Sequence, residues 1–112
     1  MSIYSKTITE LLSLLKAREI SATEITKAYL DRIKNNNDKI NAFVTVTQDT
    51  ALSMAEAADK RYKTNSTLLL DGIPLGIKDV FCTKNIRTQA ASKILDNFIP
   101  TYESTVTQKL WD

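Results

Sequence analysis

The residues best suited to chemistry in this chain are the lysine at position 78 and the glycine-containing block before it. Gly72 and Gly76 are the only two glycines, and both lie in the run GIPLGIKD, which contains Lys78 and ends at Asp79. Average composition would give about eight glycines at this length. Because both glycines of this chain lie in one block, we expect the backbone to bend there or a second backbone segment to come close. A lysine in apolar surroundings has a pKa below the usual value of about 10.4, because burial disfavours the cation. Such a lysine can act as a general base.

Alternation in the block predicts an extended strand over residues 73–81. On one face the side chains would be apolar, and the face of Lys78 would carry Pro74 and Gly76, which leave room beside the amine. Composition alone favours a simpler interpretation, in which the amine reaches water or pairs with the neighbouring carboxylate of Asp79. Asp79 could orient Lys78 or cap local backbone, and the sequence leaves both roles open.

Other reactive side chains are weaker candidates. Ser92 and Lys93 are adjacent, so on a strand they would point apart, and we expect Ser92 to be a loop hydroxyl. Cys82 is expected to be an inert buried thiol, because the chain has no histidine to activate it. The lack of histidine also excludes histidine-based metal sites and Ser-His-Asp chemistry. Lys84, Arg87 and Lys93 form a loose basic cluster, for which a solvated loop is a simpler interpretation than RNA contact.

The composition is that of an ordinary globular chain. With 112 residues, 43% hydrophobic and 25% charged, it can form one small domain. A net charge of +2 is too small to favour nucleic-acid binding by itself. The single cysteine fits a reducing compartment. Neither a signal core nor a membrane-length apolar stretch is present, so we expect a cytoplasmic location.

Helices and strands are predicted to position the candidate residues. Hydrophobic periodicity predicts helices over about 7–18, 21–35, 49–62 and 102–111, and strands over about 40–47 and 73–81. The pairs Thr7 with Glu10 and Ser21 with Glu24 have capping-box spacing.

The ends of two predicted helices are also marked in the sequence. Three asparagines at 35–37 would end the second helix, because asparagine tolerates left-handed geometry. In the last helix, Tyr102, Val106 and Leu110 are expected to face inward.

Several blocks resemble a known family. The run Leu70–Asp79 (LDGIPLGIKD) resembles the lysine-bearing strand of the amidase signature family. Two later runs, ASKIL at 91–95 and FIPTYESTV at 98–106, resemble the A subunits of tRNA-dependent amidotransferases within that family. The residues EISATE at 19–24 fit the start of those subunits. The resemblance therefore extends over nearly the whole chain.

Membership would imply a Ser–cis-Ser–Lys triad, in which Lys78 matches the lysine position. The two serines belong to a Gly/Ser-rich segment, and no glycine follows Gly76 here. We therefore expect residues 1–112 to be the N-terminal portion of a single amidase domain, truncated before that segment and inactive alone. The implied fold is α/β, with helices leading into the strands of a mixed central sheet.

The resemblance also implies partners and a reaction for the complete protein. Glutamine would be hydrolysed to ammonia, which would amidate Glu-tRNA(Gln) or Asp-tRNA(Asn). The complex would be a heterotrimer whose B subunit uses ATP and Mg²⁺ and whose small C subunit helps assembly, while this chain binds no cofactor or metal. Two alternatives stay open: another amidase-signature amide hydrolase, or a non-catalytic remnant that serves as an interaction fragment.

Overall fold

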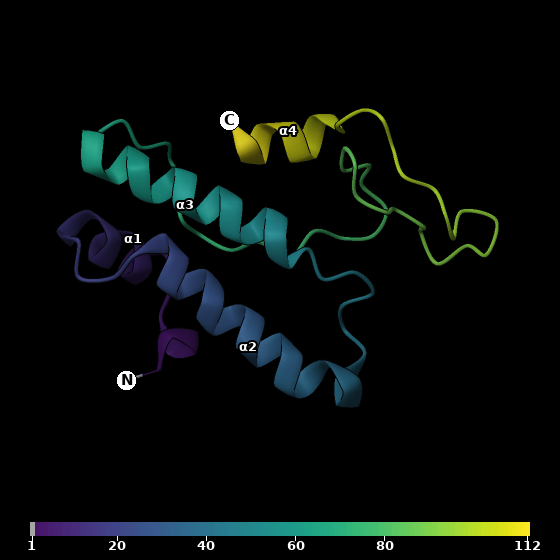
Figure 1. Cartoon of the computed structure of the whole chain (residues 1–112), viewed down its shortest axis with the longest axis horizontal. Helices are drawn as coiled ribbons and strands as arrows, with labels where there is room; N and C mark the ends of the chain where they lie inside the picture. The colour runs from purple at the N-terminus through teal and green to yellow at the C-terminus, as the bar shows by residue number, and fades with distance from the viewer. Residues whose placement is uncertain (1) are drawn as a thin grey trace. The chain divides into compact units, whose positions relative to one another are not determined.

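Helices are the only regular elements in residues 2–112, the part of the chain that a computed structural model describes (Figure 1). The elements are the 3-10 turn η1 (Ile3–Ser5) and the α-helices α1 (Ile8–Ala17), α2 (Ala22–Ile40), α3 (Gln48–Thr64) and α4 (Thr105–Trp111). The chain divides into two compact units. The first, Met1–Pro74, contains η1 to α3, and the second, Leu75–Asp112, contains α4. Within residues 2–112, no helix is both long and apolar enough to cross a membrane.

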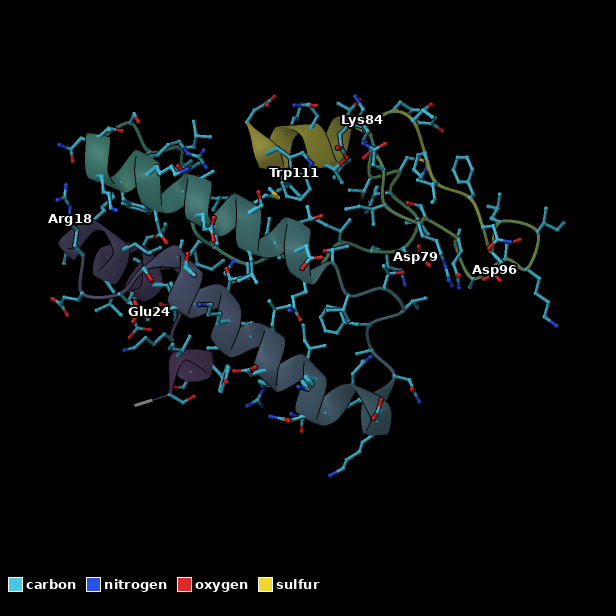
Figure 2. All side chains as sticks on the ribbon, viewed as in Figure 1. Arg18, Glu24, Asp79, Lys84, Asp96 and Trp111 are labelled. Atoms are coloured by element: carbon cyan, nitrogen blue, oxygen red, sulfur yellow. The ribbon has the colours of Figure 1, made fainter. Side chains whose placement is uncertain are left out.

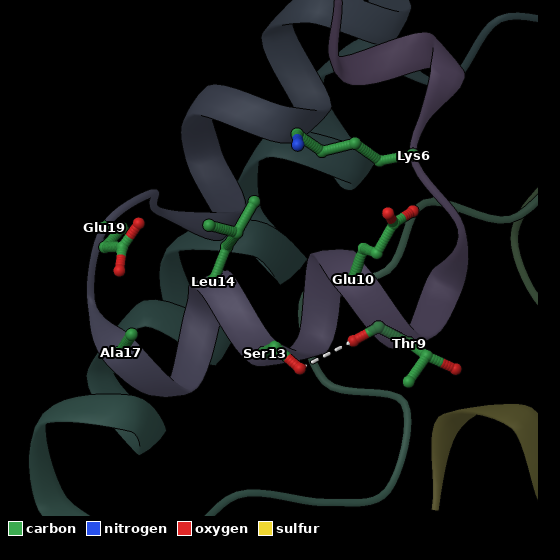
Figure 3. A pocket seen from close by; sticks show the side chains of 7 residues that line it. All are labelled: Lys6, Thr9, Glu10, Ser13, Leu14, Ala17 and Glu19. Atoms are coloured by element: carbon green, nitrogen blue, oxygen red, sulfur yellow. Dashed lines mark hydrogen bonds between the residues drawn. The ribbon is translucent and has the colours of Figure 1, made fainter. Parts of the chain in front are cut away.

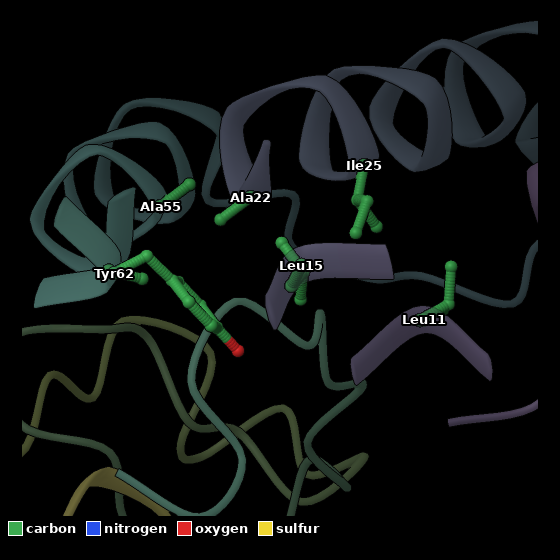
Figure 4. Close-up of a cluster of buried hydrophobic side chains, with 7 residues drawn as sticks. Leu11, Leu15, Ala22, Ile25, Ala55 and Tyr62 are labelled. Atoms are coloured by element: carbon green, nitrogen blue, oxygen red, sulfur yellow. The ribbon is translucent and has the colours of Figure 1, made fainter. Parts of the chain in front are cut away.

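One small hydrophobic core holds the three helices of the first unit together (Figure 4). The two longer helices, α2 and α3, run side by side in opposite directions (Figure 1). On α3, helical spacing brings Ala55, Ala58 and Tyr62 to the buried face. The core consists of Leu11, Leu15, Ala22, Ile25, Ala55, Ala58 and Tyr62.

Both predicted capping boxes are confirmed. The Thr7 hydroxyl accepts the N–H of Glu10 at 3.2 Å, and the Glu10 carboxylate accepts the N–H of Thr7 at 2.7 Å. Ser21 and Glu24 repeat this pattern at the start of α2, at 3.1 and 2.8 Å. These boxes satisfy backbone donors that the first turn of a helix would otherwise leave open.

Asp59 of α3 gives α2 a second cap from a distant part of the chain. Its Oδ1 accepts the N–H of Ala22 at 2.7 Å, and its Oδ2 accepts the N–H and the hydroxyl of Thr23 at 3.1 and 2.6 Å. A carboxylate at this position also suits the positive end of the helix dipole. The start of α2 is therefore fixed by its packing partner as well as by its own sequence.

The predicted α/β fold is wrong for residues 2–112, because neither predicted strand forms. The segment 40–47 begins inside α2, which continues past the asparagine run to Ile40 and ends at Asn41, with φ of 52°. Phe43 then donates its N–H to Asn37 Oδ1, and its carbonyl accepts from Asn37 Nδ2, both at 2.9 Å. A neighbouring strand would use those same backbone groups, so alternation alone makes no ladder here.

The second predicted strand, 73–81, has a turn at each end. The N–H of Ile73 donates to the carbonyl three residues back at 3.1 Å, and the carbonyl of Lys78 accepts from Val80 and Phe81 at 2.8 and 3.1 Å. Between these turns, no backbone hydrogen bond to another extended segment of residues 2–112 is formed. Strand preference depends on cross-strand neighbours, and within residues 2–112 this segment has no paired strand.

The last helix starts at Thr105, later than predicted, and of the three residues expected to face inward Leu110 alone is partly buried. Its N-cap is Ser104, whose hydroxyl accepts the N–H of Thr107 at 3.2 Å. Thr107 is fully buried, whereas Tyr102 and Val106 are 58% and 47% exposed, so their predicted inward orientation was wrong. Tyr102 precedes the helix and therefore does not follow its periodicity.

Candidate functional site

Gly72, in the glycine-containing block, is pressed against the helices of the first unit. Its φ is +81°, and a Cβ there would lie 2.9 Å from Cβ of Ala22 and 3.0 Å from the side chain of Leu15. Glycine alone meets both demands, a left-handed backbone and a gap too narrow for a methyl group. The next residue, Ile73, packs partly buried against the core. The block therefore begins as a docked backbone segment.

Asp71 anchors the same segment through its carboxylate and its carbonyl. Arg61 of α3 donates from Nε and Nη2 to the two carboxylate oxygens at 2.7 and 2.5 Å. The N–H of Leu68 adds a bond to Oδ2 at 2.9 Å, and the Tyr62 hydroxyl donates to the Asp71 carbonyl at 3.0 Å. Sequence reasoning missed this anchor, although Asp71 lies in the run Leu70–Asp79 that carries the family resemblance.

The pKa values of this anchor follow from its contacts. The hydrogen bond from Arg61, and to a lesser degree that from the N–H of Leu68, lowers the pKa of Asp71, against the opposing effect of burial. Burial raises the pKa of Tyr62, with smaller contributions from the charges of Asp71 and Asp59. The carboxylate therefore stays ionised and the phenol stays a donor at neutral pH.

Lys78 is exposed and opens the tight turn over residues 78–81. Within residues 2–112 its amine forms no ion pair, so the possible pairing with Asp79 is not formed. The neighbouring Val80 and Phe81 are 54% and 37% exposed, and thus they do not enclose the amine. The catalytic role of Lys78 stays a prediction.

The carboxylate of Asp79 binds backbone instead of the neighbouring amine. Its Oδ1 accepts the N–H of Gln89 at 2.9 Å. The preceding Thr88 is buried, and its N–H donates to the carbonyl of Phe98 at 3.0 Å. Asp79 therefore ties the turn at 78–81 to a segment that is itself held in place. The sequence left open whether Asp79 orients Lys78 or caps backbone, and the contact with Gln89 is a backbone cap.

Cys82 and Ser92 lie in local contacts within the second unit. Sγ of Cys82 donates to the hydroxyl of Tyr102 at 3.4 Å, and this contact raises the pKa of Tyr102. Cys82 is half-buried, whereas the sequence analysis expected a buried thiol. Ser92 lies in a turn: its N–H donates to the carbonyl of Gln89 at 2.9 Å, and its own carbonyl accepts from Leu95 at 3.1 Å.

The basic cluster lies on exposed loop backbone. Lys84, Arg87 and Lys93 are all exposed. Arg87 forms an ion pair with Asp96 at 3.2 Å and a hydrogen bond with the side chain of Gln89. Figure 2 labels Lys84 and Asp96 on this part of the chain. The ion pair partly neutralises the cluster, which weakens its case as an RNA contact.

A shallow hollow on α1 offers no stronger site (Figure 3). Of its two carboxylates, that of Glu10 is already used in the capping box, and the Ser13 hydroxyl donates to the carbonyl of Thr9 at 2.9 Å. The residues that line it are Lys6, Thr9, Glu10, Ser13, Leu14, Ala17 and Glu19. Residues 2–112 also contain no cluster of three or more His, Cys, Asp or Glu side chains that could hold a metal.

Comparison with known proteins identifies similar sequences. The family model described as Amidase matches residues 24–112, a range that includes the whole glycine-containing block. Proteins named as the A subunit of glutamyl-tRNA(Gln) amidotransferase, from Brucella ovis, Brucella abortus and Brucella suis, are each 56% identical to the chain over 105 residues. The alignments cover 94% of this chain and 21% of each relative, so the chain spans about a fifth of the length of the curated relatives it matches.

Proposed function

The chain belongs to the amidase family, and we propose that it is part of the glutamine-hydrolysing A subunit of a tRNA-dependent amidotransferase. The observation that carries the proposal is the 56% identity, over 94% of the chain, to proteins with that subunit name. The family match alone would fit many amide hydrolases. Identity at this level along nearly the whole chain favours the amidotransferase.

In the proposed reaction, the complete protein releases ammonia from glutamine. The ammonia then amidates glutamate on tRNA(Gln), or aspartate on tRNA(Asn). Lys78 would be the base that accepts a proton, through a bridging serine, from a nucleophilic serine. Both serines would come from outside residues 1–112. The assignment is supported by the position of Lys78 in the run Leu70–Asp79, which lies within the range that the family model matches.

We further propose that the protein acts in a complex. The relatives are named as one subunit of an amidotransferase, which points to an assembly of several chains. A B subunit would use ATP and Mg²⁺ to activate the tRNA-bound carboxylate, and a small C subunit would help assembly. We expect this complex in the cytoplasm, where aminoacylated tRNA is used for translation.

The test is a paired assay on the full-length protein, produced together with the B and C subunits from the same genome. Formation of Gln-tRNA(Gln) is measured with ATP and either glutamine or ammonium as the nitrogen source. We expect transfer from both sources. Glutamine hydrolysis without transfer, in a complex that does use ammonium, would contradict the proposal. Hydrolysis of simple amides with no tRNA-dependent activity would favour another amidase-family hydrolase instead.

A further inference from the structure

The turn that begins at Lys78 is held by a side chain that the proposed reaction does not use. The carbonyl of Lys78 accepts two hydrogen bonds within this turn, and Asp79 is the next residue. The Asp79 carboxylate reaches across the second unit to the N–H of Gln89 at 2.9 Å. Asp79 is half-buried, so water competes less for this bond than at an exposed site.

The far end of this tie is itself fixed. Next to Gln89, Thr88 is 6% exposed, and its N–H donates to Phe98 at 3.0 Å. The N–H of Asn85 donates to the carbonyl of the buried Pro100 at 2.9 Å. The tie therefore connects the start of the turn to a loop that has two backbone bonds of its own.

We infer that Asp79 is a positioning residue, which holds the backbone at Lys78 through its bond to the N–H of Gln89. This inference rests on the proposed function, because it assigns Asp79 a part in presenting the lysine of that reaction. The contact acts on geometry, since the Asp79 carboxylate binds a backbone N–H and forms no ion pair with Lys78. A misplacement of about 1 Å at a reacting group can cost on the order of 10²-fold in rate.

The geometry and the charge of Asp79 can be separated by two substitutions. Asp79→Asn keeps a carbonyl oxygen that can accept the N–H of Gln89, but it removes the negative charge next to Lys78. Asp79→Ala removes both. A positioning role therefore predicts that Asn preserves function and Ala does not, whereas a direct charge effect predicts that both fail.

The experiment measures kcat, KM and the pH profile of glutamine-driven amidation by the full-length complex. For Asp79→Ala we expect kcat to fall by about 10- to 100-fold, with KM for glutamine and ammonium-driven transfer unchanged. For Asp79→Asn we expect most of kcat to remain and the midpoints of the pH profile to stay in place. Asp96→Ala is the matched control, because it removes an exposed tie of the same unit, to Arg87, and should leave kcat unchanged.

The outcomes distinguish failure of the inference about Asp79 from failure of the proposed function. An Asp79→Ala complex with normal kcat, beside an inactive Lys78→Ala complex, overturns the inference alone. So does an Asp79→Asn complex as slow as Asp79→Ala with a displaced pH profile, because the charge would then be the active feature. If Asp79→Ala also loses ammonium-driven transfer, its role is merely structural. An unsubstituted complex that cannot use glutamine overturns both.

Discussion

Arg61 and Asp71 form a two-point ion pair that joins α3 to the residue just before Gly72. Nε and Nη2 of Arg61 lie 2.7 and 2.5 Å from the two carboxylate oxygens of Asp71. The side chain of Asp71 is 5% exposed and that of Arg61 is 35% exposed, so one partner is sheltered and the other is partly screened by water. Such fork-to-fork geometry is the strongest form of this pair.

Asp71→Ala should lower the free energy of unfolding by about 1–3 kcal/mol, the usual range for losing hydrogen bonds to a charged group. The loss leaves the N–H of Leu68 without its acceptor and Arg61 without its partner. Urea unfolding, followed by circular dichroism, measures the change. Asp96→Ala breaks an exposed pair with Arg87 and should cost less than about 1 kcal/mol. An equal effect of the two substitutions would contradict the assignment.

The same pair predicts how stability depends on pH. The folded pKa of Asp71 is lowered, chiefly by its hydrogen bond from Arg61, below the unfolded value of about 3.9. Its contribution is therefore fully present above that unfolded value and is lost as pH falls through the folded pKa. Unfolding curves at a series of pH values below about 5 should show a decline that is smaller in Asp71→Ala. Identical declines would show that other carboxylates are responsible.

Gly72→Ala should destabilise the first unit by about 2–4 kcal/mol, because strain at positive φ and overpacking add together. The new methyl group would lie 2.9 Å from Cβ of Ala22, on backbone with φ of +81°. Gly76→Ala is the control, since Gly76 is exposed and lacks positive φ. Thermal unfolding of both variants checks this, and a Gly72→Ala melt as high as that of Gly76→Ala would refute it.

Asp59→Ala should cost about 1–2 kcal/mol, as expected for loss of a helix cap. Three hydrogen bonds to Ala22 and Thr23 disappear with the carboxylate. Glu56→Ala, on an exposed position of the same helix, should be nearly neutral. The measurement is urea unfolding, and equal midpoints for the two variants would mean that the capping box of Ser21 and Glu24 alone fixes the start of α2.

Lys78→Ala and Lys78→Arg in the full-length complex should both cut glutamine-driven amidation by about 10²–10⁴-fold, the usual cost of losing a general base. Arginine fails because its guanidinium stays protonated at neutral pH. Ammonium should restore transfer, since only the glutamine half-reaction is blocked. Lys84→Ala and Lys93→Ala are the matched controls and should cost far less. Near-normal glutamine use by Lys78→Ala would show that Lys78 is not the base.

Sequence reasoning succeeded where the signal was local. A capping box needs only residues three positions apart, and Thr7 with Glu10 formed as predicted. The spacing of apolar residues along α1 places Ile8, Leu11 and Leu15 on one face. Leu11 and Leu15 are buried there, whereas Ile8 at the start of the helix is 50% exposed. These features depend on residues a few positions apart in the same helix.

It failed where the deciding partner lay elsewhere in the chain. The alternation at 40–47 resembles a strand, but the side chain of Asn37 binds both backbone groups of Phe43. No periodicity reveals such a contact, because it depends on how α2 ends. The anchor between Arg61 and Asp71 was missed for the same reason: charge spacing does not say which carboxylate a helix will meet.

The cap that Asp59 gives to α2 makes two backbone amides report on a different helix. The N–H groups of Ala22 and Thr23 bind the Asp59 carboxylate, so detachment of α3 would uncover both even if α2 stayed wound. Hydrogen–deuterium exchange at these two amides would then follow the opening of the α2–α3 contact, whereas amides in the middle of α2 would follow the unwinding of that helix. Exchange rates at the Ala22 and Thr23 amides would therefore show whether the first unit opens in parts or all at once.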